Sequence, residues 1–250
     1  VGSVRCVQET DLLRGDLGVS VKMQKNYPVI SIIKEMFPVS AKIGAFALLW
    51  AVLVGVPLGC LAAYNRGTAT DSTLRVVCTV GISMPSFVVA SLLLIVFCGG
   101  VVGWFPSIFD GSPRSYVLPC FSLGFYPMCY IARQSRAAML DAINQEYIKT
   151  ARAKGVREKA IIYSHAWRNA LIPIVTLVVG WFLGIFSGSV VIEQMFALNG
   201  MGDLMISSLR TADFDVIMLL QMFYVMLSLL GNLIIDIVYG LVDPRVRVSK

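Results

Sequence analysis

The residues that could do chemistry gather in one segment of the chain, between positions 133 and 173. This segment holds the single histidine of the sequence, His165, among many charged side chains. The spacing matches no catalytic motif, because the sequence contains no GxxxxGK[ST] phosphate loop, no HExxH zinc motif and no GxSxG nucleophile motif. One histidine is also too few for a histidine-based metal cage. We therefore expect a chain that is not an enzyme and that holds no catalytic residue, metal or cofactor of its own.

The part of this segment from residue 145 to 173 has the pattern of a docking element. It reads QEYIKTARAKGVREKAIIYSHAWRNALIP and is amphipathic on both sides of Gly155. Ile148, Ala151 and Gly155 fall at i, i+3 and i+7, and a similar spacing returns over residues 160–165. The small residues Ala151, Ala153 and Gly155 would let a partner approach closely. On spacing alone, a solvated charged loop is as good an interpretation as a docking surface.

Long apolar stretches must position this segment. The chain of 250 residues is 57% hydrophobic and only 14% charged, whereas about 25% of the residues of a soluble domain are charged. Five apolar stretches are close to the length that crosses a hydrocarbon core of about 30 Å as a helix. They are residues 43–63, 76–98, 116–135, 170–192 and 216–238. The sequence thus predicts an all-α, polytopic membrane helix bundle.

The charges of the connecting segments predict its orientation, because lysine and arginine collect on the cytoplasmic side of a membrane. The segment 133–168 is rich in both and is expected in the cytoplasm, as is the basic tail at 243–250. The segment 193–215 has four acids against a lone Arg210 and is expected outside. Basic residues in the cytoplasmic segments thus account for the net charge of +6, and we expect no nucleic acid partner.

Alternation of the spans then gives the domain organisation. Residues 1–35 would form an external segment, followed by a transmembrane domain at 36–242 and the cytoplasmic tail. An N-terminus on the outer side of the membrane requires a signal peptide or a preceding membrane helix. Since the chain shows no signal peptide, we expect that a first membrane helix precedes it.

Two sets of glycines have the spacing of helix-packing faces. Gly55 and Gly59 lie four residues apart in the first stretch, and Gly180, Gly184 and Gly188 do so in the fourth. Four-residue spacing places them on one helix face, where a backbone can approach closely. The pattern leaves open whether they pack inside this chain, pack against a second membrane subunit or contact a substrate.

The docking element resembles the EAA loop of ATP-binding-cassette (ABC) importer permeases, in the variant of the oligopeptide, dipeptide and nickel transport subfamily. The matching residues are Glu146, Thr150, Ala151, Arg152, Ala153, Lys154, Gly155, His165, Asn169 and Pro173. Lys149 stands where the general family has a glutamate, a departure that the peptide-type variant shares. Shorter matches lie at Pro85-Ser86-Phe87, Val191-Ile192-Glu193, Gly200-Met201-Gly202, Asp243-Pro244-Arg245 and Leu13 to Gly18.

The resemblance implies a type I ABC importer transmembrane domain with the MetI-like fold, in a chain that lacks the family's first helix. It implies a multi-pass permease subunit of the bacterial inner (cytoplasmic) membrane, with a cytoplasmic C-terminus, that forms half of a translocation pathway. The implied partners are a second homologous permease, cytoplasmic ATPases that carry ATP and Mg²⁺, an extracytoplasmic substrate-binding protein and membrane lipid. The EAA-type loop would couple this chain to the ATPase.

The substrate implied by the resemblance is a di- or oligopeptide, and nickel and glutathione are alternatives within the same transporter class. An ion-coupled secondary carrier is an alternative of another class. It would need charged residues deep in the spans and repeated halves, and neither is visible in the sequence.

Overall fold

The computed structural model describes residues 18–98, 103–157, 160–161, 166–186 and 189–242. Over these residues the chain is mainly helical, as predicted, and its two short strands form a ribbon in which Val19 pairs with Pro28. The strands are β1 (Val19–Ser20) and β2 (Tyr27–Pro28). The helices are α2 (Val29–Tyr64), α3 (Ala69–Ser83), α4 (Ser86–Leu93), the π-helix η1 (Leu94–Cys98), the 3₁₀-helix η2 (Pro113–Tyr116), α5 (Val117–Ile143), α6 (Glu146–Ala153), α8 (Trp167–Phe186), α9 (Val190–Met195), α10 (Met201–Thr211) and α11 (Phe214–Val242).

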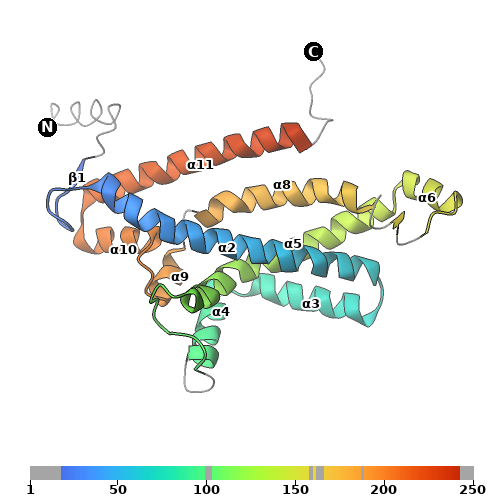
Figure 1. Cartoon of the computed structure of the whole chain (residues 1–250), viewed down its shortest axis with the longest axis horizontal. Coiled ribbons are helices and arrows are strands. Elements are labelled where there is room, and N and C mark those ends of the chain that lie inside the picture. Colours follow the sequence, from blue (N-terminus) through green and yellow to red (C-terminus); the bar gives the residue numbers. More distant parts are fainter. Residues whose placement is uncertain (1–17, 99–102, 158–159, 162–165, 187–188, 243–250) are drawn as a thin grey trace, which may run out of the picture.

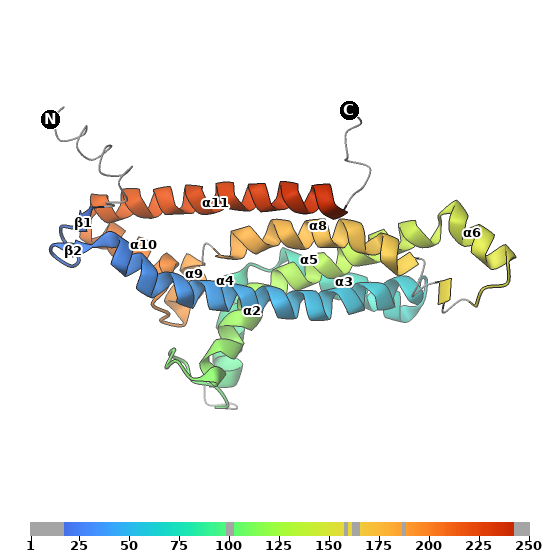
Figure 2. The ribbon, with the colours of Figure 1, turned by 45° about the horizontal axis from the view of Figure 1, so that its top comes forward.

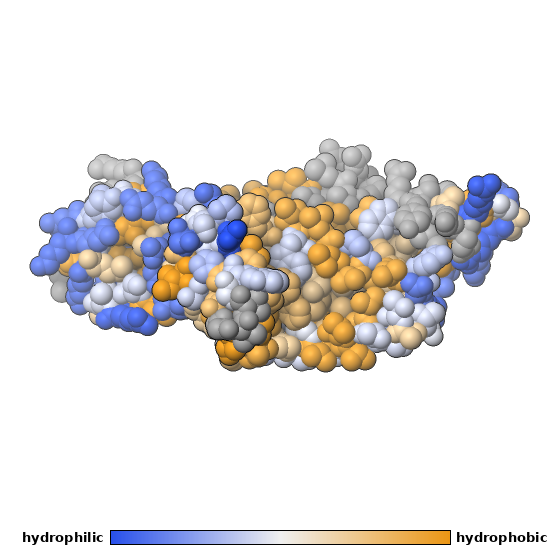
Figure 3. Space-filling view, turned by 60° about the horizontal axis from the view of Figure 1, so that its bottom comes forward, coloured by the Kyte–Doolittle hydropathy of each residue, from blue (hydrophilic) through white to orange (hydrophobic). Residues whose placement is uncertain are grey.

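The long helices run along the longest axis of the molecule, and α4 points away from it (Figures 1 and 2). One end, which we call the α6 end, carries α6 and the last turn of α2. The opposite end, which we call the β1 end, carries the two strands, α9 and α10. In the space-filling view, hydrophobic residues cover the middle and hydrophilic residues gather at both ends (Figure 3). This banded surface suits a protein whose middle lies in lipid.

Two described helices, α2 and α11, are by themselves long and apolar enough to cross a membrane. A third span exists if α3 and the helix after it are taken together, but the two are bent by 101°. The predicted stretch 76–98 therefore consists of more than one helix, with a break at Met84 and Pro85. The helix stops because Pro85 has no backbone N–H and disfavours the helical conformation at Met84, and both residues are extended, with ψ of 123° and 143°.

The other two predicted stretches lie in helices whose bounds differ from the predicted ones. The stretch 116–135 lies almost wholly in α5, which continues through Pro127 to Ile143. The stretch 170–192 covers most of α8 and then enters the short α9.

Helices α2 and α5 form the central pair of the bundle. A Cβ added to Gly55 would lie 2.7 Å from the carbonyl oxygen of Met128, and one on Gly59 would lie even closer to that of Ala132. Ile131 is fully buried at this contact. The backbones approach so closely because these glycines have no side chain, which is typical of helix pairs in membranes. This close contact joins α2 to α5 in the middle of the bundle and toward its α6 end.

Candidate functional site

Helix α6 ends in a tight turn at the tip of the molecule. Gly155 has a φ of +77°, in the region that favours glycine. Its N–H donates to the carbonyl of Arg152 (2.9 Å), and the N–H of Val156 donates to the carbonyl of Ala151 (3.2 Å). These two bonds form a Schellman motif, which closes a helix whose next residue is left-handed. A Cβ on Gly155 would meet no described atom within 4 Å, so no described part of the chain covers the turn.

The inner face of α6 is fixed to the bundle. Ile148 is fully buried and packs with Ala63 of α2, Met139 of α5 and Ala170 of α8. The amide nitrogen of Asn169 donates a hydrogen bond of 2.7 Å to the Tyr147 hydroxyl, and so ties α6 to the first turn of α8. Three long helices thus hold this short helix in a defined position.

The outer face of α6 is charged and exposed. Glu146 and Lys149 form a surface ion pair of 3.3 Å, and the Thr150 hydroxyl donates to the carbonyl of Glu146 (3.1 Å). Arg152, Ala153 and Lys154 follow on the exposed tip. An anchored helix that presents small and basic side chains at one end of a membrane bundle can bind a partner and transmit its movement.

One further residue of the predicted coupling loop, Pro173, lies apart from this tip. Pro173 lies inside α8 on its exposed side and lacks the N–H that would bond to the carbonyl of Asn169. His165 lies outside the described residues.

A cavity of about 570 Å³ lies at the break between α3 and α4. Its polar lining comes from Ser83 and Ser86 beside the break and from Ser189. Its aromatic lining comes from Tyr126 and Trp181, whose ring centroids are 5.5 Å apart in an edge-to-face arrangement. Non-helical backbone at membrane depth is tolerated where it is buried in protein or lines a water-filled cavity. The serine hydroxyls and the aromatic rings of this open cavity can contact a solute that has both polar and apolar groups.

The glycines of α8 lie near this cavity and do not pack as those of α2 do. Gly184 lines it, and a Cβ added to Gly180 or Gly184 would meet no described atom within 4 Å. Gly188 lies outside the described residues.

An ion pair near the α6 end joins α3 to α5. The Asp71 carboxylate is 1% exposed and accepts two bonds from Arg136, from Nε at 2.7 Å and from Nη2 at 2.9 Å. The N–H of Gly67 donates to the same carboxylate at 3.2 Å. The sequence offered only a weak signal for this pair, in that Asp71 is the sole acid of the segment 65–75.

The β1 end is closed around a buried carboxylate, that of Glu193. It accepts from the Ser40 hydroxyl (2.7 Å) and from the N–H groups of Gly202 (2.7 Å) and Asp203 (3.1 Å) in the first turn of α10. Ser40 in turn accepts from the N–H of Met201 at 2.8 Å. Burial raises the pKa of Glu193, against the lowering effect of these hydrogen bonds. One side chain thereby ties α2, α9 and α10 together.

A second carboxylate, that of Asp213, fixes the strand ribbon to the start of α11. Its Oδ2 accepts from the Ser20 hydroxyl (2.7 Å) and from the N–H groups of Lys22 (2.9 Å) and Met23 (3.0 Å). Burial raises the pKa of Asp213, but these donors together outweigh it and bring the pKa to about 2, below its ordinary 3.8. Asp213 thus remains an ionised acceptor at neutral pH.

We expect Asp213→Ala to free the ribbon, because its donors lose their acceptor. Trypsin added to right-side-out vesicles should then cut after Lys22 or Lys25 much faster than in the unmodified protein. The folded pKa is lowered, so the attachment should be complete above about pH 4 and should be lost as the pH falls toward about 2. Tyr27→Phe, which removes only an exposed hydrogen bond of 3.3 Å to Glu35, is the control. Equal cleavage of both variants would contradict the role of Asp213.

Comparisons with known proteins identify the family and the fold of the chain. Residues 55–248 match the family described as binding-protein-dependent transport system inner membrane component. The chain is 37% identical over 235 residues to the dipeptide transport system permease protein DppB of Bacillus subtilis, a match that covers 94% of this chain and 76% of that protein. It is 38% identical over 239 residues to the oligopeptide transport system permease protein OppB of Haemophilus influenzae, with 95% and 78% covered.

Solved structures of other ABC transporters share the fold. The MetNI methionine ABC transporter in an inward-facing conformation has a chain that superimposes with a TM-score of 0.69 at 16% identity, over 86% of this chain and 97% of that one. An amino acid ABC transporter gives a TM-score of 0.62 at 14% identity, over 84% and 94%.

Proposed function

The chain belongs to the family of binding-protein-dependent transport system inner membrane components, the permease subunits of ABC importers, and from this premise we propose that it forms half of a pathway for di- or oligopeptides. The observation that carries the proposal is the cavity at the α3–α4 break. Serine hydroxyls beside an extended backbone can hydrogen-bond to peptide groups, and the rings of Tyr126 and Trp181 can contact side chains of varied shape.

The partners in this proposal are a second homologous permease, cytoplasmic ATPases and an extracytoplasmic binding protein. The ATPases would bind α6 and would carry the ATP and Mg²⁺. The α6 end and the C-terminus would then lie in the cytoplasm, and the β1 end would face the binding protein. The charge distribution of the connecting segments supports this orientation, as does the position of α6 at the end opposite to α10.

Reconstituted uptake tests the proposal. The chain is assembled with its partner subunits in vesicles, and ATP-dependent uptake of labelled di- and oligopeptides is measured beside nickel and glutathione. Trp181→Ala should raise the KM for peptide by roughly tenfold, the equivalent of about 1.4 kcal/mol, and should leave the basal ATPase rate unchanged. Trp104→Ala, at an exposed position, is the control. Uptake of nickel or glutathione without peptide would contradict the substrate, and an unchanged KM would contradict the cavity.

A further inference from the structure

A long apolar groove runs along the outside of the contact between α2 and α5. It has a volume of about 820 Å³, and we call it the α2–α5 groove. One wall is the exposed face of α2, with Phe46, Leu49 and Leu53, and the other is formed by Tyr116, Val117 and Phe121 at the start of α5. This groove is separate from the cavity at the α3–α4 break and shares no lining residue with it.

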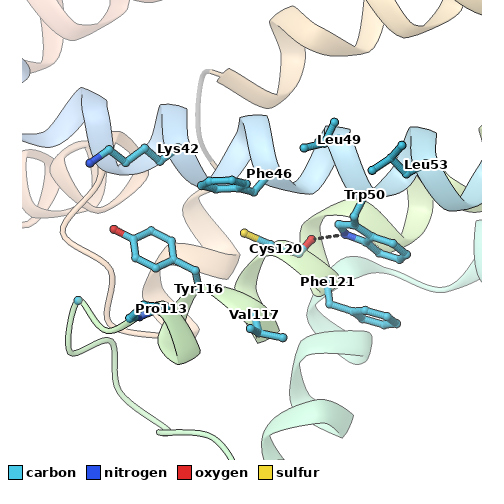
Figure 4. A pocket seen from close by; sticks show the side chains of 11 residues that line it. Lys42, Phe46, Leu49, Trp50, Leu53, Pro113, Tyr116, Val117, Cys120 and Phe121 are labelled. Carbon is cyan, nitrogen blue, oxygen red and sulfur yellow. Dashed lines mark hydrogen bonds between the residues drawn. The ribbon is translucent and has the colours of Figure 1, made fainter.

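The polar groups of the groove lie at one end (Figure 4). Among the described residues that line it, Lys42 alone is charged. Its amine and the hydroxyl of Tyr116 point toward the same end, and the apolar side chains follow from there along α2. Lys42 directly precedes the apolar stretch 43–63, so its amine stands at the level where lipid headgroups begin.

The apolar length of the groove matches one leaflet of a bilayer. Lys42, Phe46, Leu49 and Leu53 follow at i, i+4, i+7 and i+11 on one face of α2. Eleven residues at about 1.5 Å each give roughly 16 Å, close to half of a hydrocarbon core of about 30 Å. An acyl chain whose headgroup sits at Lys42 would thus be covered to about the middle of the membrane.

At the end of the groove away from Lys42, stacked aromatic side chains form a wall that a hydrogen bond holds in place. The Trp50 ring stacks on Phe121 with centroids 4.7 Å apart, and its N–H donates to the carbonyl of Cys120 at 2.9 Å. The indole N–H is therefore satisfied within the chain, and the ring faces offer only apolar surface to an occupant. Such a wall suits a hydrocarbon chain.

The charges around the open end favour an anionic headgroup. Lys42 lies beside η2, which contributes Arg114, and both side chains are exposed. Asp110, an acid of the loop before η2, is not among the described residues that line the groove. A headgroup phosphate at this place would meet one lysine amine and one tyrosine hydroxyl.

We propose that the α2–α5 groove binds a single anionic phospholipid, with its phosphate at Lys42 and Tyr116 and one acyl chain along Phe46, Leu49 and Leu53. This site is independent of the peptide substrate and of the coupling through α6. It would make the transporter sensitive to the lipid composition of its membrane.

The test uses the assembled transporter in nanodiscs of equal parts phosphatidylglycerol and phosphatidylethanolamine, extracted for native mass spectrometry. The unmodified protein should retain phosphatidylglycerol with a preference of about fivefold, which one lysine near an anionic headgroup supplies. Lys42→Glu should abolish this preference, whereas Lys34→Glu, an equal change at an exposed position on the same helix, should keep it. Leu49→Trp should fill the groove and lose the bound lipid, whereas Leu61→Trp, at an exposed leucine of α2 outside the groove, should retain it.

A photo-cross-linking residue at Phe46 provides a second measurement on otherwise unmodified protein. An adduct with the mass of one phospholipid supports the proposal. An adduct with the second permease polypeptide overturns it, because the groove would then be a subunit interface. Equal phosphatidylglycerol retention by all four variants also overturns it.

Discussion

Replacing Gly155 by glutamine is expected to abolish uptake while the protein stays folded in the membrane. The left-handed φ of +77° becomes strained with any Cβ, at a cost of roughly 1 kcal/mol, and the new side chain projects from the tip of α6 into the proposed ATPase contact. Ala153→Trp should act in the same way from an exposed position without changing the turn. A loss of about 1.4 kcal/mol in docking free energy lowers the affinity for the ATPase tenfold. Peptide uptake and co-purification of the ATPase are the two measurements.

Gly67 provides a closely matched control. It has a φ of +80°, has no described atom within 4 Å of an added Cβ, and lies in the loop between α2 and α3 near the same end of the molecule. Gly67→Gln therefore introduces the same side chain and the same backbone strain away from α6, and should leave uptake near normal. If the Gly155 and Gly67 variants lose uptake equally, or if the ATPase stays bound and active in both α6 variants, α6 is not the coupling element.

Replacing Glu193 by alanine is expected to cause the largest loss of stability. The Ser40 hydroxyl and the N–H groups of Gly202 and Asp203 would lose their acceptor at a site that is 3% exposed. A buried donor without a partner costs about 1 to 3 kcal/mol, so we expect a loss of about 3 kcal/mol in the free energy of unfolding. For a chain of this size the Tm should fall by roughly 10 °C. Glu193→Gln keeps one carbonyl oxygen and should be intermediate.

Unfolding can be followed with a thiol-reactive fluorophore in detergent, because Cys78, Cys120 and Cys129 are buried in the folded chain. Glu35→Ala, which removes an exposed glutamate of α2, should leave the Tm unchanged. A Tm for Glu193→Ala within a degree or two of that control would show that the carboxylate network adds little to stability.

Features that depend only on residues close together in the chain could be predicted from the sequence. Hydropathy located the apolar stretches, and a glycine between two amphipathic patterns indicated the sharp turn at Gly155. Local patterns cannot give the direction of the chain after an interruption. Pro85 alone is compatible with a membrane helix that continues through it, as α5 does through Pro127, so neither the stop at this proline nor the bend of 101° was predicted.

Contacts between distant parts of the chain were not visible in the sequence. Ser40 and Glu193 are 153 residues apart, and Ser20 and Asp213 are 193 apart. In each pair a serine meets an acid for which the sequence indicated no partner. Arg136 likewise counted only as a basic charge, although it holds Asp71 across 65 positions. A single sequence gives no signal for such pairing, because either residue alone also suits a solvated surface.

The two carboxylate contacts of the β1 end set an order for the synthesis of this protein. Each joins α2 or the ribbon before it to residues beyond position 190, so neither can form until the ribosome has made those residues. Until then the hydroxyls of Ser20 and Ser40 lack these acceptors, while the middle helices enter the membrane. A chain that stops before residue 193 can make neither contact, and its β1 end would stay open and exposed to proteases.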